Sequence, residues 1–359
     1  MVGFLILALI AAGPLVSTCF AKAYPVFYRG VRPLGMGGAF TAVADDENAL
    51  FYNPAGISHV EHLSFDALNL IVELSEKSMD LYEDMENTDM DDPEEVNDLL
   101  KKYVGEHQHA RVALYPNVGF QVANVGVLIG VLAQGQVDLD VRNPAWPEAH
   151  CDVVQDTAFL AGGGLKVPIA GLRVGAAIKS VSRESLEEIY TAPIIAGEDF
   201  DKRLEDDMKS GSGFALDVGA IYRLPFVPVL DTDIGLAIQN IPEMDMGDAK
   251  DVNTQVNFGI AVGKSLAKFK LVGALDYVDV TREYEEDDDL GKRLHMGVEL
   301  QTPLFISVRA GLNQGYLTAG ATADFRFVRL DFATYTEEVG AFAGQREDQR
   351  YIFQLTAGW

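Results

Sequence analysis

The stretch YIFQLTAGW (residues 351–359) alternates strictly between large apolar side chains and smaller or polar ones. The residues on one face are Tyr351, Phe353, Leu355, Ala357 and Trp359. A period of two is the geometry of a β-strand, whose successive side chains point to opposite faces of a sheet. The segment therefore predicts a strand with one apolar face and one more polar face.

The same alternation continues through most of the chain after residue 107, for example in residues 127–141, 253–263 and 306–313. Many of these runs have ten or more residues, which exceeds the usual strand and matches the length of a tilted membrane strand. We expect about fourteen strands, near residues 61–73, 110–120, 125–140, 152–166, 171–183, 213–224, 231–241, 253–264, 269–281, 292–302, 304–313, 316–324, 327–336 and 349–359.

The predicted connections alternate between short and long. Short turns such as VANV (122–125), VPIA (167–170) and SLAK (265–268) separate longer loops near residues 75–108, 184–211, 242–252, 282–291 and 337–348. Short turns at one end and long loops at the other are typical of an outer-membrane barrel. We therefore predict an all-β fold, a transmembrane antiparallel barrel of about 14 strands over residues 61–359. The alternative is a soluble protein with many strands.

Charge supports the same arrangement. The net charge is −26, and four blocks at residues 76–106, 184–209, 243–251 and 282–293 hold 31 of the 54 Asp and Glu residues. In the predicted barrel these blocks fall on the long-loop, extracellular side. A surface this acidic repels phosphate backbones, so no nucleic-acid partner is expected.

The N-terminus reads as a targeting segment. Residues 2–21 carry no charge, and Ala21-Lys22-Ala23 fits a signal-peptide cleavage site, so residues 1–23 are predicted to be a signal peptide. An uncleaved membrane anchor is the alternative. Cys19 would leave with the signal, and Cys151 alone cannot form an internal disulfide. The expected location is the outer membrane of a Gram-negative cell.

Residues 24–60 precede the first strand and are predicted to plug the barrel. Fourteen strands enclose more space than the strands' own side chains fill. In DDENALFYNPAGI (45–57), Asp45 is expected to cap a short helical turn that ends at Asn53, before proline. Gly35, Gly37 and Gly38 would let the backbone pack closely against the barrel wall.

The stretch RPLGMGGAFTAVADDENALFYNPAGI (32–57) resembles the hatch signature of FadL-type long-chain fatty acid transporters and of related PorV-type and aromatic-hydrocarbon outer-membrane channels. A second stretch, YPNVGFQVANVGVLIGVLAQGQVDL (115–139), resembles the strand pair that follows the hatch in that family. The C-terminal strand resembles the assembly signal that the barrel-insertion machinery reads, with Tyr351, Phe353, Leu355 and Trp359 as its apolar positions.

The resemblance implies passive uptake of hydrophobic small molecules, such as long-chain fatty acids or hydrocarbons. The alternative within the family is a PorV-like structural or shuttle component of a secretion system. The implied hatch or gate residues are Gly37, Gly38, Asn53, Pro54 and Ala55. The family's lateral gap would fall near Pro116, Gln134, Gly135 and Gln136, although Gly135 could equally make room for a neighbour.

The first long loop contains its own predicted helix. In DPEEVNDLLKKYV (92–104), Asp92 can cap, Pro93 suits the first helical position and Glu95 can complete a capping box. The apolar stripe of this helix is Val96, Leu99, Leu100 and Tyr103. By resemblance to helical outer loops of the family, the stripe would capture the ligand; alternatively, it packs on the barrel rim.

The sequence gives no pattern for catalysis or for a cofactor, so no enzyme activity and no cofactor is expected. His107 and His109 are a weak metal candidate, residues 283–291 could bind Ca²⁺, and His295 is a loose catalytic candidate. Inward-facing cations could hold a carboxylate or be neutralised by Asp217, Asp276 and Asp331; they are Arg173, Lys179, Arg309 and Arg329. The expected partners are a hydrophobic small molecule, outer-membrane lipid and lipopolysaccharide, around a monomer.

Overall fold

The computed structural model describes residues 23, 26–225, 230–282 and 289–359. They form one closed antiparallel sheet, in which each strand pairs with its neighbours and β15 pairs back with β1. β2 and β3 are consecutive pieces of one barrel strand, because both pair with β1 and β4. The barrel therefore has fourteen strands, as predicted. The strands are β1 (Ser64–Ser75), β2 (His107–Leu114), β3 (Asn117–Val122), β4 (Val125–Arg142), β5 (Glu148–Lys166), β6 (Leu172–Thr191), β7 (Lys209–Arg223), β8 (Asp231–Ile241), β9 (Gln255–Leu266), β10 (Phe269–Tyr277), β11 (Leu294–Gln301), β12 (Ile306–Asn313), β13 (Tyr316–Asp324), β14 (Val328–Glu338) and β15 (Glu347–Gly358).

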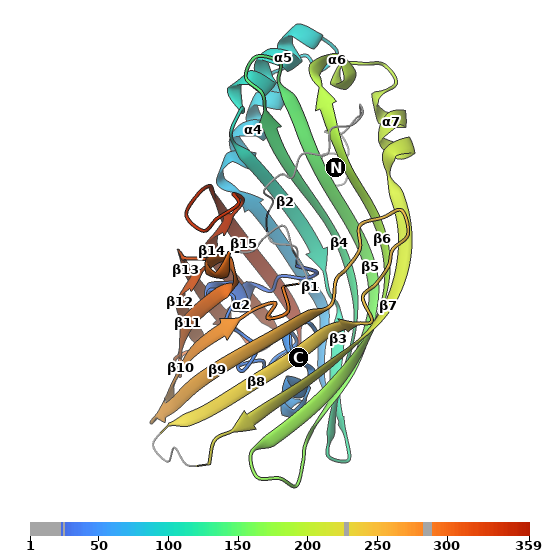
Figure 1. Ribbon diagram of the computed structural model, residues 1–359. Helices are drawn as coiled ribbons and strands as arrows, with labels where there is room; N and C mark the ends of the chain where they lie inside the picture. Colours follow the sequence, from blue (N-terminus) through green and yellow to red (C-terminus); the bar gives the residue numbers. More distant parts are fainter. Residues whose placement is uncertain (1–22, 24–25, 226–229, 283–288) are drawn as a thin grey trace.

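The barrel wall is much taller on one side than on the other. β4, β5 and β6 extend well beyond the short β10 to β13 strands at the long-loop end (Figure 1). Residues 184–191, predicted to start a loop, instead continue β6 in register with residues 148–155 of β5. The acidic side chains there do not end the strand, because Glu184 and Glu187 are exposed and water solvates them within the sheet.

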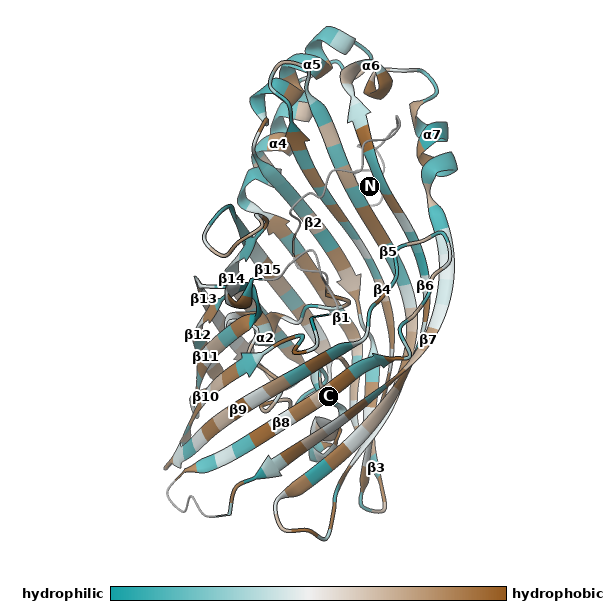
Figure 2. Cartoon of the chain, viewed as in Figure 1, coloured by the Kyte–Doolittle hydropathy of each residue, from teal (hydrophilic) through white to brown (hydrophobic). Residues whose placement is uncertain are grey.

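The two faces of the sheet differ as the alternation predicts. Bands of apolar residues cross the strands, as Figure 2 shows. The strand registers put a set of exposed apolar side chains on one outward face, among them Val131, Phe159, Ile178, Leu236, Phe258, Leu271, Val298, Val308, Leu330 and Phe353. This is the lipid-facing band that a membrane barrel needs, since backbone groups in hydrocarbon must all be paired within the sheet.

Helices occupy the plug and the outer loops. Within the barrel lie α2 (Val31–Gly35), α3 (Ala49–Tyr52) and the 3-10 helix η1 (Pro54–His59); in the loops lie α4 (Glu76–Glu86), α5 (Pro93–Lys102), α6 (Ala192–Ile195), α7 (Phe200–Asp207) and η2 (Leu290–Arg293). In the part of the chain that the structure describes, no helix has the length and apolar character needed to cross a membrane.

A charge placed on the outward face should destabilise the barrel. Leu236 lies in the middle of β8 and is 45% exposed. We expect Leu236→Arg to lower the free energy of unfolding in lipid vesicles by about 2–4 kcal/mol, the cost of arginine near the bilayer midplane. The matched control is Met79→Arg on α4, where the side chain is already exposed to water. Equal urea midpoints for the two variants would contradict the membrane orientation.

Candidate functional site

The N-terminal segment runs through the barrel and contacts opposite walls. α2 lies against β12, β13 and β14, whereas η1 lies against β4, β5, β6 and β7. Nearly all residues from Tyr28 to Ser58 are buried or half-buried. The described part of this segment is therefore packed as the core of the barrel.

Glycines on both the plug and the wall let the two backbones touch. Gly37 has φ +65°, and a Cβ there would lie 2.4 Å from the carbonyl oxygen of Met296 and 2.5 Å from that of Leu312. A Cβ on Gly297 or Gly311 of the facing strands would meet Met36 or Gly37 in the same way. No residue with a side chain fits this contact, so the predicted close packing of the hatch glycines is present.

Asn53 links two parts of the plug and lies against the barrel wall. Its amide nitrogen donates to the carbonyl oxygen of Thr41 at 2.8 Å, and its oxygen accepts from the Ala55 N–H at 3.1 Å. Asn53, Pro54 and Ala55 pack over wall glycines, where a Cβ on Gly219 would lie 2.0 Å from the Asn53 amide oxygen. Asn53 therefore begins η1 as its cap, and Asp45, predicted to cap the preceding turn, does not do so.

Asp45 instead belongs to an ionic clamp around Arg32 of α2. The Arg32 guanidinium contacts Asp45 at 2.6 Å, Asp46 at 2.8 Å and Glu299 of β11 at 2.9 Å. Burial alone would raise the pKa of Asp45, but Arg32 outweighs it and, together with Lys270, lowers this pKa to about 2. The clamp therefore stays charged at neutral pH and ties the plug to the wall.

Asp276 of β10 holds the plug through its backbone. Its carboxylate accepts from the N–H groups of Phe40 and Thr41 at 2.7 and 2.6 Å. Asp276 was predicted to neutralise an inward-facing cation. This prediction is wrong, because its carboxylate binds backbone N–H groups. A carboxylate that accepts two backbone N–H groups satisfies donors that the non-helical plug backbone cannot pair internally.

The other inward cations are paired with carboxylates of this chain, which is the second of the two predicted alternatives. The pairs are Arg173–Asp233 at 3.1 Å, Lys179–Asp217 at 2.8 Å and Arg309–Asp331 at 3.7 Å, with Arg329 shared between Asp331 and Glu47.

His107 and His109 also contact carboxylates, and His295 contacts the Gly37 carbonyl. Among the described residues, no group of three or more His, Cys, Asp or Glu residues is placed to hold a metal ion. Residues 283–288 of the proposed Ca²⁺ loop lie outside the described chain.

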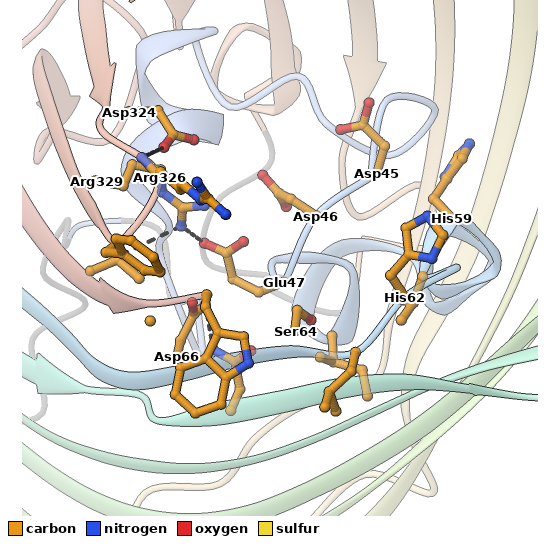
Figure 3. Close-up of a pocket in the computed structure, with 18 of the residues that line it drawn as sticks. Asp45, Asp46, Glu47, His59, His62, Ser64, Asp66, Asp324, Arg326 and Arg329 are labelled. Atoms are coloured by element: carbon orange, nitrogen blue, oxygen red, sulfur yellow. Dashed lines mark hydrogen bonds and ion pairs between the residues drawn. The ribbon is translucent and has the colours of Figure 1, made fainter. Parts of the chain in front are cut away.

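A cavity of about 440 Å³ opens between the plug and the short-turn rim of the barrel. Figure 3 shows Asp45, Asp46 and Glu47 of the plug near its edge, with Asp66 and Arg329 from the barrel. One of the dashed contacts in the figure is the ion pair between Glu47 and Arg329, which joins the plug to β14. Six carboxylates and six large apolar side chains line this acidic vestibule, so an apolar molecule that left through it would pass charged groups.

The loop of residues 242–254, between β8 and β9, covers the lumen from the opposite, long-loop end. Met244 and Met246 lie against Gly213 and Gly211, inward-facing residues of β7. Lys250 contacts Asp152 of β5 at 2.5 Å, and further contacts reach β6. We call residues 242–254 the lid.

Four aromatic rings meet where the plug crosses the interrupted second strand of the barrel. Tyr28 stacks on Phe51 with ring centroids 3.8 Å apart, and Tyr115 lies 5.0 Å from Phe51 and 5.9 Å from Tyr28. Phe27 completes the group at 6.3 Å from Phe51. We call Phe27, Tyr28, Phe51 and Tyr115 the aromatic seam; its rings pack together between the plug and the wall.

The strand pairing does not support the lateral gap predicted at Gln134, Gly135 and Gln136. These residues are paired without a register shift to residues 113–111 of β2 and 156–154 of β5. Gly135 causes no bulge in this pairing. A Cβ at Gly135 would face open space outside the sheet. The second strand is interrupted at Pro116, the other residue of that prediction, where β2 and β3 separate, and beside it β1 bulges near Ala67.

The apolar stripe of α5 is buried, so it is not the exposed capture groove that was one of the two predictions. Val96, Leu99, Leu100 and Tyr103 are each at most 8% exposed. They pack on outward-facing residues of the tall wall, including Leu139, Cys151 and Tyr190. Asp92 caps α5 as predicted, by accepting from the Glu94 N–H, whereas Glu95 accepts from Asp89 rather than closing the capping box. The burial favours the alternative, a helix packed on the rim.

Sequence reasoning missed Arg32, Glu299 and Glu47, which hold the plug. Arg32 was visible as a charge at the start of an otherwise apolar, glycine-rich run, and a buried cation requires a partner. Its partner Glu299 is far away in sequence, and only the folded barrel brings the two together. Tyr28 and Tyr115 were likewise not recognised as neighbours.

The fold matches solved membrane channels. The Ralstonia pickettii toluene transporter TbuX has a TM-score of 0.56 at 13% identity, covering 92% of this chain and 97% of its own. The TodX deltaS2S3 mutant monoaromatic hydrocarbon channel gives 0.53 at 10% identity, and the CymD monoaromatic hydrocarbon channel 0.50 at 11%, each covering 94% of this chain and 98% of its own. At 10–13% identity these likenesses show the fold alone, the closed barrel that this chain shares with the three channels. No protein-family model and no curated protein sequence matches the chain.

Removing the Asn53 amide should loosen the plug. Asn53→Ala leaves the buried Thr41 carbonyl without this donor, at a cost of about 1–3 kcal/mol. We expect a lower urea midpoint and faster trypsin cleavage after Arg29. The control Asn87→Ala removes a similar side-chain bond from an exposed helix end. Unchanged protease resistance in Asn53→Ala would contradict the anchoring role.

Shortening the α5 stripe should destabilise the outer loop without affecting ligand binding. Leu100→Ala deletes a buried side chain, at about 2–5 kcal/mol of local stability. Trypsin should then cut faster at Lys101 and Lys102, whereas the exposed control Asp98→Ala should change little. Weakened binding of a hydrophobic ligand with no change in cleavage would restore the capture prediction.

Proposed function

We propose that this chain is an outer-membrane channel that lets hydrophobic small molecules pass down their concentration gradient. The observation that carries the proposal is a closed barrel with an apolar outer band whose lumen holds its own N-terminal segment and an aromatic seam. The fold shared with TbuX and CymD, described as a toluene transporter and a monoaromatic hydrocarbon channel, supports the same reading. Long-chain fatty acids are a second cargo class within this proposal.

Binding in such a lumen is driven by burial of apolar surface, worth about 25 cal/mol per Å². The acidic vestibule at the short-turn end opposes the exit of an apolar molecule in that direction. We therefore place the exit in the wall between β1 and the β2–β3 break, beside the aromatic seam. Pro116 has no N–H to donate there, and the β1 bulge leaves three residues facing two across the junction.

Uptake of the apolar dye N-phenyl-1-naphthylamine by intact cells tests the function. The lipopolysaccharide leaflet slows this dye, so cells that produce the barrel should fill faster than cells with an empty vector. Equal rates, together with a protein partner that co-purifies with the barrel, would instead support the secretion-system alternative.

Breaking the lid contact should raise the uptake rate. Lys250→Met removes the contact with Asp152, so the lid is held to β5 less firmly and opens more often. We expect dye uptake severalfold above that of the wild type at equal barrel abundance. The control Lys209→Met removes a lysine at an exposed position of the neighbouring β7. A lid variant that behaves like this control would show that residues 242–254 do not limit entry.

A further inference from the structure

Three buried hydrogen-bond donors at the aromatic seam have no partner among the described residues. They are the hydroxyl groups of Tyr28 and Tyr115 and the Nη1 atom of Arg111. Tyr28 is 3% exposed, Tyr115 is fully buried, and Arg111 is 2% exposed. A buried donor that finds no acceptor opposes folding, so such groups call for an explanation, and a missing ligand is one.

The three groups belong to one neighbourhood. The Arg111 guanidinium lies 5.9 Å from the centroid of the Tyr28 ring, which is itself 5.9 Å from the ring of Tyr115. Tyr115 lies flat over Gly130 of β4, where a Cβ would come within 2.5 Å of its ring. The donors therefore lie at a buried cluster of aromatic rings, with the Gly130 backbone of β4 beside Tyr115.

The charge of Arg111 is already balanced. Its Nε donates to Glu73 at 2.7 Å and its Nη2 donates to the Arg29 carbonyl at 2.8 Å. Glu73 also contacts His109 at 3.3 Å and Arg350 at 3.9 Å, while Arg29 pairs with Glu337. The seam therefore has unpartnered hydrogen-bond donors but no unbalanced positive charge. This combination favours an uncharged acceptor over a carboxylate.

We propose that the aromatic seam selects aromatic molecules that carry an uncharged oxygen acceptor, such as an aryl ketone, over hydrocarbons of the same size. The ring of the ligand packs on Phe51 and its neighbours, and its oxygen accepts from the hydroxyl group of Tyr28 or Tyr115. This inference rests on the proposed function and narrows its cargo. A site with donors set to meet an oxygen discriminates strongly against an analogue that lacks it.

Equilibrium dialysis of the purified full-length protein in detergent micelles tests the selection, with protein-free micelles as the blank. Acetophenone and ethylbenzene are the matched probes, because they share eight carbons and differ in the carbonyl group. We expect the wild type to bind acetophenone about tenfold more tightly than ethylbenzene, as expected for one net hydrogen bond of ordinary strength. Benzoate, with the same ring and a full charge, should bind more weakly than acetophenone.

The decisive variants are Tyr28→Phe and Tyr115→Phe, which keep the rings and remove the hydroxyls. Each should reduce the preference for acetophenone severalfold while leaving ethylbenzene binding unchanged. Tyr190→Phe is the matched control, since Tyr190 is also fully buried with an unpartnered hydroxyl but packs under α5, away from the seam.

The outcomes separate the two proposals. Equal binding of both probes by the wild type, or a preference that survives in both seam variants, would overturn the selection and leave passive uptake standing. Tighter binding of benzoate would overturn it in favour of a carboxylate site. Binding of none of the probes, with no dye uptake in cells, would overturn both proposals.

Discussion

Every backbone N–H and C=O group inside a bilayer must find its partner within the protein, and this constraint shapes the whole molecule. A sheet meets it only by closing, which is why β15 pairs back with β1. Closure then turns the apolar face outward and leaves a lumen that the strands' own side chains do not fill. The plug fills this lumen and is hydrogen-bonded to the wall. Asp276 accepts from the Phe40 and Thr41 N–H groups of the plug, and the Asn53 amide donates to the wall carbonyls of Ala220 and Leu236.

Glycine allows the plug and the wall to meet backbone to backbone. Gly37 lies directly against the carbonyl groups of Met296 and Leu312. No flexible side chain lies between the two backbones to absorb a shift of one against the other. Such an interface resists small deformations, so a passage past the plug must either move the plug as a unit or go around it. In our proposal, the route around the plug runs beside the aromatic seam and the nearby interruption at Pro116.

The tall part of the wall explains why the apolar stripe of α5 was compatible with two predictions. An amphipathic helix such as α5 has the same apolar stripe whether it captures a ligand or packs on a sheet. The extended upper parts of β4, β5 and β6 offer an apolar outer face beyond the bilayer, and the stripe covers that face. Apolar residues of this loop region thus contribute to stability, while polar contacts to the lid close the lumen.

Alternation of side chains by itself determined the strands, their two faces and the barrel, because the period of two is a local property of an extended chain. Glycines and the Asn53-Pro54 pair likewise marked the plug. Only the tertiary structure decided which groups meet: Arg32 with Glu299, Asp45 with Arg32 rather than a helix end, and Tyr28 beside Tyr115. These contacts join residues far apart in the chain, and their choice depends on strand register and closure, which no local pattern encodes.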